Sequence, residues 1–593
     1  MRILGISCYY HDAAAVLLED GVLLAAAQEE RFSRRKHDPG FPERAIRFCL
    51  DLAGITSADL DYVVFYEKPF VKFERLLTTL VAAVPHSAKL FREAMLVWLG
   101  DKLWLKQHIA ERVGVPSHRI LFVEHHLSHA ASALFCSPYT DAALLTVDGV
   151  GEWTTAAHGT GSAAWNGAGD NRITLDAELR FPHSLGLLYS AFTAWLGFEV
   201  NEGEYKVMGM APYGEPKYVD KVRRTVHVYE DGSLHVDLAY FSYPHHTERT
   251  FSDKFVALFG LARDPRARFV TKQTSRFDDP TPPTQRELEQ NQYYADVAAS
   301  IQAVTEDILL RMVRHLHART GLPRLCMAGG VALNSVANFK ILTQTPFEEV
   351  YIQPAAGDAG GALGAALYAH HVLLGRPRRF VLDHAAWGES HDGSPVARFL
   401  AETGLEAQHL PDEERLVDRT VELLDRGKVV GWVQGRFEWG PRALGHRSIL
   451  ADARRAEMKD IVNIKIKFRE AFRPFAPSVL AEKAGDFFAL PNPERHFPAR
   501  FMLYVTPVRQ PRLLPAVTHA DGTGRLQIVV REQNPRYYRL LERFGQATGV
   551  PALLNTSFNL KGEPIVNTPA EAVRTFRASD MDALVLDEWL VEK

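Results

Sequence analysis

The sequence predicts an α/β protein of more than one unit, on three observations. At 593 residues the chain is too long for a single hydrophobic core, and usual domain sizes suggest roughly two to four units. Two short apolar strands break at glycine and open a helix, in LPRLCMAGGVALNSVANFKIL and VYIQPAAGDAGGALGAALYAHHVL. A stretch rich in proline, glycine and charge follows, LGRPRRFVLDHAAWGESHDGSP. We therefore expect a large domain over 1–375, a linker over 376–395 and a smaller domain over 396–593.

The composition is that of an ordinary globular protein and excludes several classes. Lys and Arg total 68 against 72 Asp and Glu, so the overall charge does not favour a nucleic acid or an anionic membrane as partner. The four cysteines are far apart and show no CxxC spacing, which fits a reducing compartment. The N-terminus lacks the pattern of a signal peptide, and no apolar run reaches about 18 residues. The expectation is a cytoplasmic protein without a membrane partner.

The opening residues MRILGISCYYHDAAAVLLEDGVLLAAAQEE read as a strand, a polar tip, a strand, an Asp-Gly turn and a third strand. The segment AALLTVDGVGEWTTAAHGTGSAAW at 142–165 has the same rhythm, which suggests a degenerate duplication. Tips of this kind place side chains and backbone amides at the end of a sheet, where anionic ligands are commonly held.

Helical spacing of apolar residues marks two further regions. Residues from about 66 to 118 carry them at three- and four-residue intervals, and so does QYYADVAASIQAVTEDILLRMVRHLHART. Between these regions, 235–290 is aromatic and then polar and proline-containing, which indicates an irregular insertion or surface loop.

The segment VEHHLSHAASALF places three histidines in an apolar setting. On a helix, His125 and His129 at i and i+4 share one face and can ligate one ion, while His126 faces elsewhere. Asp148 ends an apolar strand and Asp358 opens a helix, so both are candidate ligands, although an Asp in such a place is often only a cap or turn residue. Two His and two Asp suit iron, manganese or zinc. The residues alone leave two interpretations equally open, a metal site, and a polar helix surface or hydrogen-bonded core histidines.

The glycines of MAGGVALN and AAGDAGGALG stand where a strand passes to a helix, so backbone amides can approach a phosphate. Packing of small residues is the alternative for either segment alone. Together, and beside the two strand tips, they indicate an ATP-binding, actin-like fold.

Basic residues cluster after the linker, among glycine, proline and aromatic residues. They are Arg436, Arg442, Arg447, Lys465, Lys467, Arg469 and Arg473. This mixture of basic residues with glycine, proline and aromatic residues favours a rigid pocket for a compact anion, and a solvated basic surface is the alternative. Asn555, Ser557 and Asn559 add neutral hydrogen-bonding groups near the C-terminus.

Taken in order, these motifs resemble the NodU/CmcH family of O-carbamoyltransferases along essentially the whole chain. The segments that carry the resemblance are HDAAAVLLEDG, EERFSRRKHD, HHLSHAASA, TVDGVGE, AGGVALN, GDAGGALGAA, GWVQGRFEWGPRALGHRS, RPFAPS and LNTSFNLKGEPIV. The resemblance implies an N-terminal domain of the actin-like ATPase (ASKHA) fold and a smaller YrdC-like α/β domain at the C-terminus.

The same resemblance implies an activity. The C-terminal domain would convert carbamoyl phosphate and ATP to an O-carbamoyladenylate, and the N-terminal domain would pass the carbamoyl group to an acceptor hydroxyl. The implied cofactors are ATP with Mg²⁺ and a divalent metal, with iron as the expected ion. Acceptors in the family range from chitooligosaccharides to antibiotic scaffolds and aminoglycosides, so the acceptor here stays open, and a homodimer is compatible with the sequence.

Matching motif positions assign roles to residues. The implied metal ligands are His125, His129, Asp148 and Asp358, and His11 matches the general base on the acceptor hydroxyl. Lys206 and Asn334 match nucleotide-contacting positions, and the turns with Gly329 and Gly330 would hold the adenylate phosphate. The positions matching the pocket for carbamoyl phosphate and ATP are Arg436, Arg442, Lys467, Arg473, Arg525 and Asn555.

The sequence favours two other functions less. A transferase of the tRNA threonylcarbamoyl type would need a strongly basic surface, which the near-neutral charge does not favour. A non-catalytic ATP-binding regulatory protein would be expected to lack the His/Asp set or the arginine pocket, and both are present in the sequence.

Overall fold

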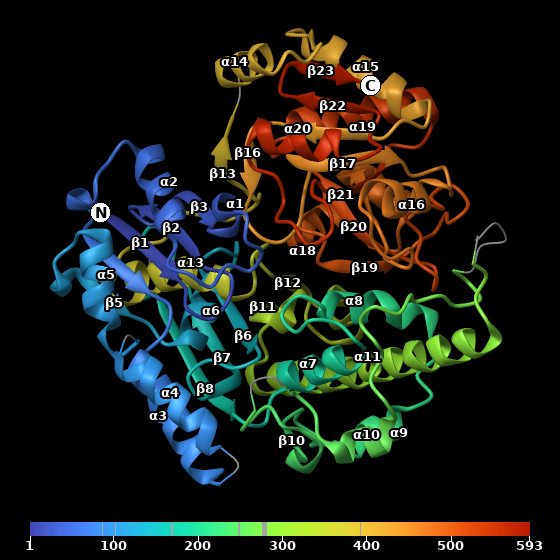
Figure 1. Ribbon diagram of the computed structural model, residues 1–593. Coiled ribbons are helices and arrows are strands. Elements are labelled where there is room, and N and C mark those ends of the chain that lie inside the picture. The colour runs from blue at the N-terminus through green and yellow to red at the C-terminus, as the bar shows by residue number, and fades with distance from the viewer. Residues whose placement is uncertain (86, 101, 168–169, 247–248, 275–280, 392) are drawn as a thin grey trace. The chain divides into compact units, whose positions relative to one another are not determined.

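The computed structural model describes residues 1–593 except 86, 101, 168–169, 247–248, 275–280 and 392 (Figure 1). The chain forms two compact units. The first contains Met1–Ala26 and Pro39–Val381, and the second contains Ala27–Asp38 and Leu382–Lys593. A short segment near the N-terminus therefore belongs to the second unit, and the predicted domain boundaries stay a prediction.

The first sheet of the first unit has five strands in the order β3-β2-β1-β4-β5. They are β1 (Arg2–Ser7), β2 (Ala14–Glu19), β3 (Val22–Gln28), β4 (Tyr62–Phe65) and β5 (Ile120–Phe122). Strand β1 runs antiparallel to β2 and parallel to β4, and β4 is parallel to β5. The predicted Asp-Gly turn joins β2 to β3, with positive φ angles of 49° at Asp20 and 80° at Gly21.

The second sheet repeats this arrangement, in the order β12-β11-β6-β7-β8. Its strands are β6 (Asp141–Val147), β7 (Thr154–Ser162), β8 (Arg172–Arg180), β11 (Arg324–Ala328) and β12 (Glu349–Tyr351). Here β6 is antiparallel to β7 and parallel to β11, as β1 is to β2 and β4. The two sheets thus share strand order and direction, so the duplication suggested by the sequence extends to whole sheets.

Two helices rich in small residues pack against each other, α6 (His125–Leu134) and α13 (Asp358–Tyr368). Helix α13 also contacts β1, β2 and β4, and α6 contacts β6, β7 and β11. Their approach is close, because a Cβ atom on Gly364 would lie 1.7 Å from the carbonyl oxygen of Ser128. Any larger residue at this position would push the helices apart.

Further helices cover the first unit. They are α2 (Glu43–Ala53), α3 (Pro69–Ala82), α4 (Ala88–Gly100), α5 (Leu105–Val113), α7 (Leu185–Trp195), α8 (Glu204–Met210), α9 (Val219–Arg223), α10 (Asp253–Phe259), α11 (Gln285–Thr320) and α12 (Ser335–Gln344). The helices predicted within 66–118 are confirmed as α3 to α5 (Figure 1). The long helix α11 starts at a capping box of Thr284 and Glu287 and ends at Gly321.

The region 235–290 is less irregular than predicted. It contains β10 (Leu234–Val236), which pairs with β9 (Val226–Val228), and it contains α10 and the start of α11. Residues 247–248 and 275–280 of this region lie outside the described residues. Among the described residues, no helix combines the length and the apolar character needed to cross a bilayer.

The second unit is built on a nine-stranded sheet, in the order β14-β23-β22-β15-β17-β21-β18-β20-β19. These strands are β14 (Gln408–His409), β15 (Val430–Val433), β17 (Arg447–Asp452), β18 (Ala476–Leu480), β19 (Tyr504–Pro507), β20 (Thr523–Val529), β21 (Ala552–Ser557), β22 (Ala583–Leu586) and β23 (Trp589–Glu592). A two-stranded sheet pairs β13 (Ala386–Ser390) with β16 (Arg436–Glu438). Strand β13 lies within the predicted linker 376–395, of which residue 392 is outside the described residues.

The helices of this unit pack against the sheet, and an apolar core lies between them. They are α14 (Ser394–Thr403), α15 (Glu413–Asp425), α16 (Met458–Asp460), α17 (Ala484–Phe487), α18 (Phe497–Arg500), α19 (Pro535–Thr548) and α20 (Pro569–Arg577). The buried core joins Leu424 of α15, Trp432 of β15 and Phe544 of α19.

The segment Ala27–Asp38, with helix α1 (Glu30–Ser33), is bound to the second unit by two arginines. Arg31 is fully buried and donates from Nη2 to the carbonyl oxygen of Gly440 at 2.8 Å. Arg34 donates to the carbonyl oxygens of Ile565 at 2.7 Å and Pro564 at 2.8 Å. The motif EERFSRRKHD is thus part of this unit's framework.

The predicted fold class is confirmed: the chain is an α/β protein with a duplicated, actin-like N-terminal part and a separate C-terminal α/β part. The YrdC-like character of the second unit stays a prediction.

Candidate functional site

Helix α6 presents two histidines at one point in the first unit. The helix begins at His125, and His129 follows one turn later on the same face. Their Nε2 atoms lie 3.0 Å apart, and the exposed fractions of the two residues are 1% and 0%. The expected common direction of the two imidazoles is therefore confirmed.

Two carboxylates meet these histidines. Asp148 follows β6, and its Oδ2 lies 2.9 Å from Nε2 of His125 and 3.3 Å from Nε2 of His129. Asp358 is the first residue of α13, and its Oδ1 lies 3.6 Å from each of the same nitrogens. One atom from each of the four residues fits within 4.8 Å of the others. The fold thus brings together residues that are up to 233 positions apart in the chain.

These four residues fit a divalent cation. Both carboxylate oxygens of Asp358 are buried and have no hydrogen-bond partner in the described structure. An ionised group in such a place is costly unless it is paired or coordinates a metal. Two imidazole nitrogens and two carboxylates are a mixed N/O donor set of the kind that holds iron, manganese or zinc. The geometry could hold a metal ion, and it leaves the identity of that ion open.

The charges of this cluster depend on one another. Burial alone would raise the pKa of Asp148, but hydrogen bonds from His125 and His129 bring it well below its usual value. Burial alone would lower the pKa of His129, but Asp148 and Asp358 raise it to about 9. Protons on the imidazoles thus balance the carboxylates, and a cation at the same point would take over that role.

The glycine pair behind the cluster holds one of its ligands. The backbone N–H of Gly330 donates to Oδ1 of Asp148 at 2.9 Å. Gly329 has a φ of 96°, and a Cβ atom there would lie 2.2 Å from the carbonyl oxygen of Val147. The pair therefore orients Asp148, a role that the sequence did not reveal. Its contact with an adenylate phosphate stays a prediction.

His126, whose role was open, is a structural residue. Its Nε2 lies 2.9 Å from the carbonyl oxygen of Thr154, and its Nδ1 lies 2.7 Å from the hydroxyl oxygen of Thr146. Burial, with the neighbouring His125 and His129, lowers the pKa of His126 well below its usual value. The neutral ring thus donates from Nε2 and accepts at Nδ1.

His11 lies beside the cluster, in the tip between β1 and β2. Its Nδ1 is 3.0 Å from Oδ2 of Asp12, and its Nε2 is 3.7 Å from Oδ2 of Asp358. Burial alone would lower the pKa of His11, but Asp358 and Asp12 raise it to about 10. Since a cation would offset the charge of Asp358, it would also make the neutral, proton-accepting form of His11 more accessible.

The two residues predicted to contact a nucleotide have partners within the first unit. Asn334 caps α12 by accepting from the backbone N–H of Ala337, and its amide exchanges hydrogen bonds of 3.1 Å with the amide of Gln302. Lys206, in α8, places its ammonium 5.8 Å from the ring centre of Phe198. Their contact with a nucleotide stays a prediction.

In the second unit, Lys467 is a buried amine among neutral acceptors. It follows a π-helical stretch, Ile461–Ile466, and 2% of it is exposed. Its Nζ donates to the carbonyl oxygen of Ser557 at 2.6 Å and to Oδ1 of Asn559 at 2.8 Å. Such π-helical turns are frequent at functional sites.

The electrostatic surroundings of Lys467 are unfavourable to its charge. Burial lowers the pKa of Lys467 well below its usual value, and Arg469, Arg473 and Lys36 lower it further. Positive groups thus gather around an amine whose hydrogen-bond acceptors are uncharged. An anion bound beside Lys467 would relieve this repulsion, which makes the place a candidate anion pocket.

Asn555, in β21, is held in one orientation. Its Nδ2 donates to Oε1 of Gln527 at 2.8 Å and to the carbonyl oxygen of Ala443 at 3.2 Å. Gln527 is fixed in turn, because its Nε2 donates to the carbonyl oxygen of Leu444. The Oδ1 atom of Asn555 is therefore an acceptor, and it is buried with no donor in the described structure. Alternate residues of a strand share a face, so this amide lies on the same side as Ser557.

The predicted arginines differ in their surroundings. Arg436 donates to the carbonyl oxygens of Gly388 at 2.7 Å and Trp387 at 2.6 Å, which are contacts of the protein's own framework. Arg473 acts on Lys467 and lies 3.5 Å from a carboxylate oxygen of Glu470.

The other basic residues have equally distinct places. Arg442 lies in the loop between β16 and β17, and Arg525 lies in β20, opposite Val505 of β19. Arg447 is fully buried and donates to backbone carbonyls, including that of Gln434 at 2.8 Å. A solvated basic surface is therefore not the setting of Arg447 or Lys467.

Three other residues contribute to these sites but were not identified from the sequence. Asp12 pairs with His11, Gln527 fixes Asn555, and Glu152 accepts from the backbone N–H of His125 at 3.0 Å. The adjacent His11 and Asp12 were a possible signal. The partners of Gln527 and Glu152 were not readable, because they depend on contacts between distant segments.

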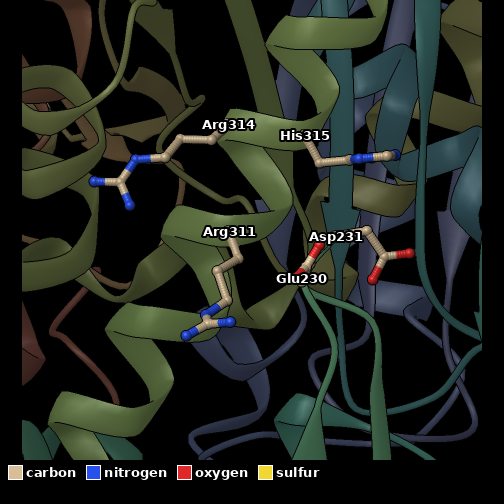
Figure 2. Close-up of a pocket in the computed structure, with 5 residues that line it drawn as sticks. All are labelled: Glu230, Asp231, Arg311, Arg314 and His315. Carbon is tan, nitrogen blue, oxygen red and sulfur yellow. The ribbon is translucent and has the colours of Figure 1, made fainter.

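An open pocket lies elsewhere, between α11 and the β9–β10 turn. Figure 2 shows its lining, Glu230, Asp231, Arg311, Arg314 and His315. Arg311 already pairs with Asp307 at 3.0 Å, and Arg314 donates to the carbonyl oxygen of Gln344 at 3.1 Å. None of the predicted site residues lines this pocket, and we assign it no function.

Two family models match the chain. The model described as "Carbamoyltransferase N-terminus" matches residues 2–367, and the model described as "Carbamoyltransferase C-terminus" matches residues 421–593. The first alone covers more than half of the chain.

Relatives match over the whole length or over half of it. The uncharacterised protein sll1178 of Synechocystis is 46% identical over 100% of this chain and 97% of its own length. Nodulation protein NolNO of Sinorhizobium fredii is 38% identical over 99% of this chain and 79% of its own. The 3'-hydroxymethylcephem-O-carbamoyltransferase of Streptomyces clavuligerus is 35% identical over 46% of this chain and 50% of its own.

Solved structures match the chain only remotely. Component A of (R)-2-hydroxyglutaryl-CoA dehydratase from Acidaminococcus fermentans is 14% identical with a TM-score of 0.31, over 62% of this chain and 98% of its own. HypF from T. kodakarensis is 13% identical with a TM-score of 0.29, over 63% of this chain and 48% of its own.

Proposed function

Because this chain belongs to the carbamoyltransferase family, we propose that it is an ATP-dependent O-carbamoyltransferase. It would move the carbamoyl group of carbamoyl phosphate, through an O-carbamoyladenylate, onto a hydroxyl of a sugar or natural-product acceptor. The observation that carries the proposal is the meeting of four buried candidate metal ligands beside a histidine, in a chain whose other unit holds a buried lysine with further cationic residues around it.

The proposed reaction has two stages, and the atoms balance in each of them. Carbamoyl phosphate and water give carbamate and phosphate, and carbamate attacks the α-phosphorus of ATP to give carbamoyladenylate and pyrophosphate. The acceptor hydroxyl then attacks the carbamoyl carbon. A new C–O ester bond forms, the C–O bond to the adenylate breaks, and AMP leaves while the hydroxyl proton passes to a base.

The second unit would perform the first stage. Its substrates are polyanions, so their approach requires preorganised positive charge. Lys467 and the arginines around it supply that charge, and Arg436, Arg442, Arg473 and Arg525 are the proposed partners of the phosphates. The oriented Oδ1 of Asn555 would accept a hydrogen bond from the amino group of the carbamoyl moiety.

The first unit would perform the transfer. A divalent cation held by His125, His129, Asp148 and Asp358 would supply Lewis-acid polarisation of the adenylate. Nε2 of His11 faces this cluster, and its Nδ1 is held by Asp12, so the ring has a fixed orientation for taking the hydroxyl proton. Lys206, Asn334 and the Gly329–Gly330 turn are the proposed contacts of the nucleotide.

The test is nucleotide-dependent turnover of carbamoyl phosphate by the purified chain. We expect pyrophosphate release that requires both carbamoyl phosphate and ATP, measured by a coupled pyrophosphate assay with divalent metal and Mg²⁺ present. Acetyl phosphate is the matched control, because a methyl group replaces the amino group that Asn555 would bind. Pyrophosphate release at equal rates with and without carbamoyl phosphate would contradict the proposal. A screen with labelled carbamoyl phosphate and mass spectrometry would identify the acceptor.

The variant His11→Asn separates the two stages. We expect it to release pyrophosphate at the rate of the unsubstituted chain but to transfer the carbamoyl group about 100- to 10,000-fold more slowly, because a general base contributes that much. The measurements are pyrophosphate release and carbamoylated acceptor, with an acceptor from the screen. His118→Asn, an exposed histidine of the same unit, is the control. Undiminished transfer by His11→Asn would remove this residue as the base.

A further inference from the structure

The loop between β6 and β7 contains a buried carboxylate, Glu152, that the proposed reaction does not use. It lies four residues after the metal ligand Asp148, and 6% of it is exposed. Its carboxylate accepts two backbone hydrogen bonds from segments far away in the chain. Oε1 lies 2.7 Å from the backbone nitrogen of Lys68 and 3.0 Å from that of His125.

Both of these N–H groups stand at the start of a helix that lacks a cap of its own. Helix α3 begins after Lys68 and α6 begins after Glu124, and neither of these N-cap side chains makes a capping hydrogen bond. The first N–H groups of a helix have no partner within the helix, and the positive end of its dipole favours a carboxylate. Glu152 therefore caps two helices at once from a third segment.

The first residue of α6 is itself a metal ligand, so the cap acts on the metal centre directly. Glu152 holds the backbone nitrogen of His125, whose Nε2 faces Asp148. The preceding residue, Gly151, fits against the same side chain, since a Cβ atom there would lie 2.9 Å from Cβ of His125. Arg75 of α3 secures the loop by donating to the carbonyl oxygen of Gly151 at 3.0 Å.

We propose that Glu152 is a positioning residue of the metal centre, which fixes the backbone of His125 and thereby sets the affinity and geometry of the cation site. The segment DGVGE, residues 148–152, then contributes to the centre at three positions. Asp148 supplies a ligand, Gly151 leaves room for the side chain of His125, and Glu152 holds the backbone of His125. This inference rests on the metal centre of the proposed function.

The experiment measures Co²⁺ binding by the full chain, through the d–d absorption of the ion and a titrated Kd. We expect Glu152→Ala to raise the Kd at least about 10-fold and to change the absorption spectrum, since partners that orient metal ligands typically contribute 10- to 100-fold in affinity. Glu152→Gln keeps an oxygen that can accept from both N–H groups, so its Kd should lie between those of the alanine variant and the unsubstituted chain.

The matched control is Glu124→Gln. Glu124 stands at the same helix start but is half-exposed, and it pairs with the Lys68 ammonium instead of a backbone N–H. Its removal should change the Kd less than about 2-fold, as expected for an exposed ion pair. If only the charge of Glu152 mattered, its glutamine variant would bind as weakly as its alanine variant, and the positioning role would be overturned.

Thermal unfolding without Co²⁺, measured in parallel, separates positioning from general stability. A lower Tm for Glu152→Ala together with an unchanged Kd and spectrum would overturn the inference. Glu152→Gln serves where the alanine variant does not fold. Equal Co²⁺ binding by all variants would overturn this inference alone, whereas the absence of binding by the unsubstituted chain would overturn it together with the metal centre.

Discussion

Asp358→Asn is expected to abolish carbamoyl transfer and to weaken divalent-metal binding by well over 100-fold. The change removes one of the two carboxylates of the cluster, and the loss should exceed the 10- to 100-fold that residues behind the ligands contribute. Pyrophosphate release should persist, because the proposed adenylate-forming residues belong to the other unit. The measurements are metal content after dialysis, a titrated Kd and carbamoylated acceptor.

The stability of this variant should fall as well. Asp358 raises the pKa of His11 and of His129, so without a cation its carboxylate is paired with their protons and stabilises the fold. We expect the Tm of Asp358→Asn, measured with a chelator near neutral pH, to lie below that of the unsubstituted chain. Asp141→Asn, at the exposed start of β6, is the control. Retained metal binding and transfer in Asp358→Asn would contradict the four-ligand centre.

Lys467→Met is expected to reduce pyrophosphate release about 100- to 1,000-fold, which is the usual cost of removing one preorganised donor from a reacting site. Methionine keeps the length of the side chain but leaves Ser557 and Asn559 without the ammonium. Lys465→Met, an exposed lysine in the same π-helical stretch, is the control. Equal loss in both variants would indicate a general basic surface and contradict a specific pocket.

The same lysine predicts a pH effect with a definite sign. Burial and the nearby arginines lower the pKa of Lys467, and a bound phosphate would raise that pKa by adding negative charge. Between these two pKa values, binding of carbamoyl phosphate takes up a proton, so affinity falls as pH rises through this window. Calorimetry in buffers of different ionisation enthalpy should detect the uptake, and it should be absent in Lys467→Met.

The sequence predicted part of the arrangement of the four candidate metal ligands, because two of their features follow local rules, while the set of four came from the family resemblance; that they bind a metal stays a prediction. Two histidines four apart on a helix share a face whatever the fold, and Asp148 and Asp358 stand at the strand end and helix start where α/β proteins gather ligands. Repeated strand and turn patterns likewise predicted the duplicated sheets.

The sequence was silent where long-range contacts decide. The side chain of Asn334 caps α12 and bonds with Gln302, 32 positions away, which the sequence did not reveal, and its contact with a nucleotide stays a prediction. The capping role of Glu152 needs two helix starts that lie 84 and 27 positions from it. Such contacts cannot be read from the spacing of residues in the sequence, because they form only when complete helices and strands pack together.

The course of the chain between the two units bears on whether the chain can be divided. Segment Ala27–Asp38 precedes most of the first unit in the sequence, yet Arg31 and Arg34 bind carbonyl groups of residues 440, 564 and 565. A split of the chain near residue 381 would therefore leave these carbonyl groups of the C-terminal fragment without the arginines that bind them. The N-terminal fragment would keep Arg31 and Arg34 without their partners. Separation of the chain at this boundary is thus disfavoured, because the second unit is built from two segments that lie on either side of it.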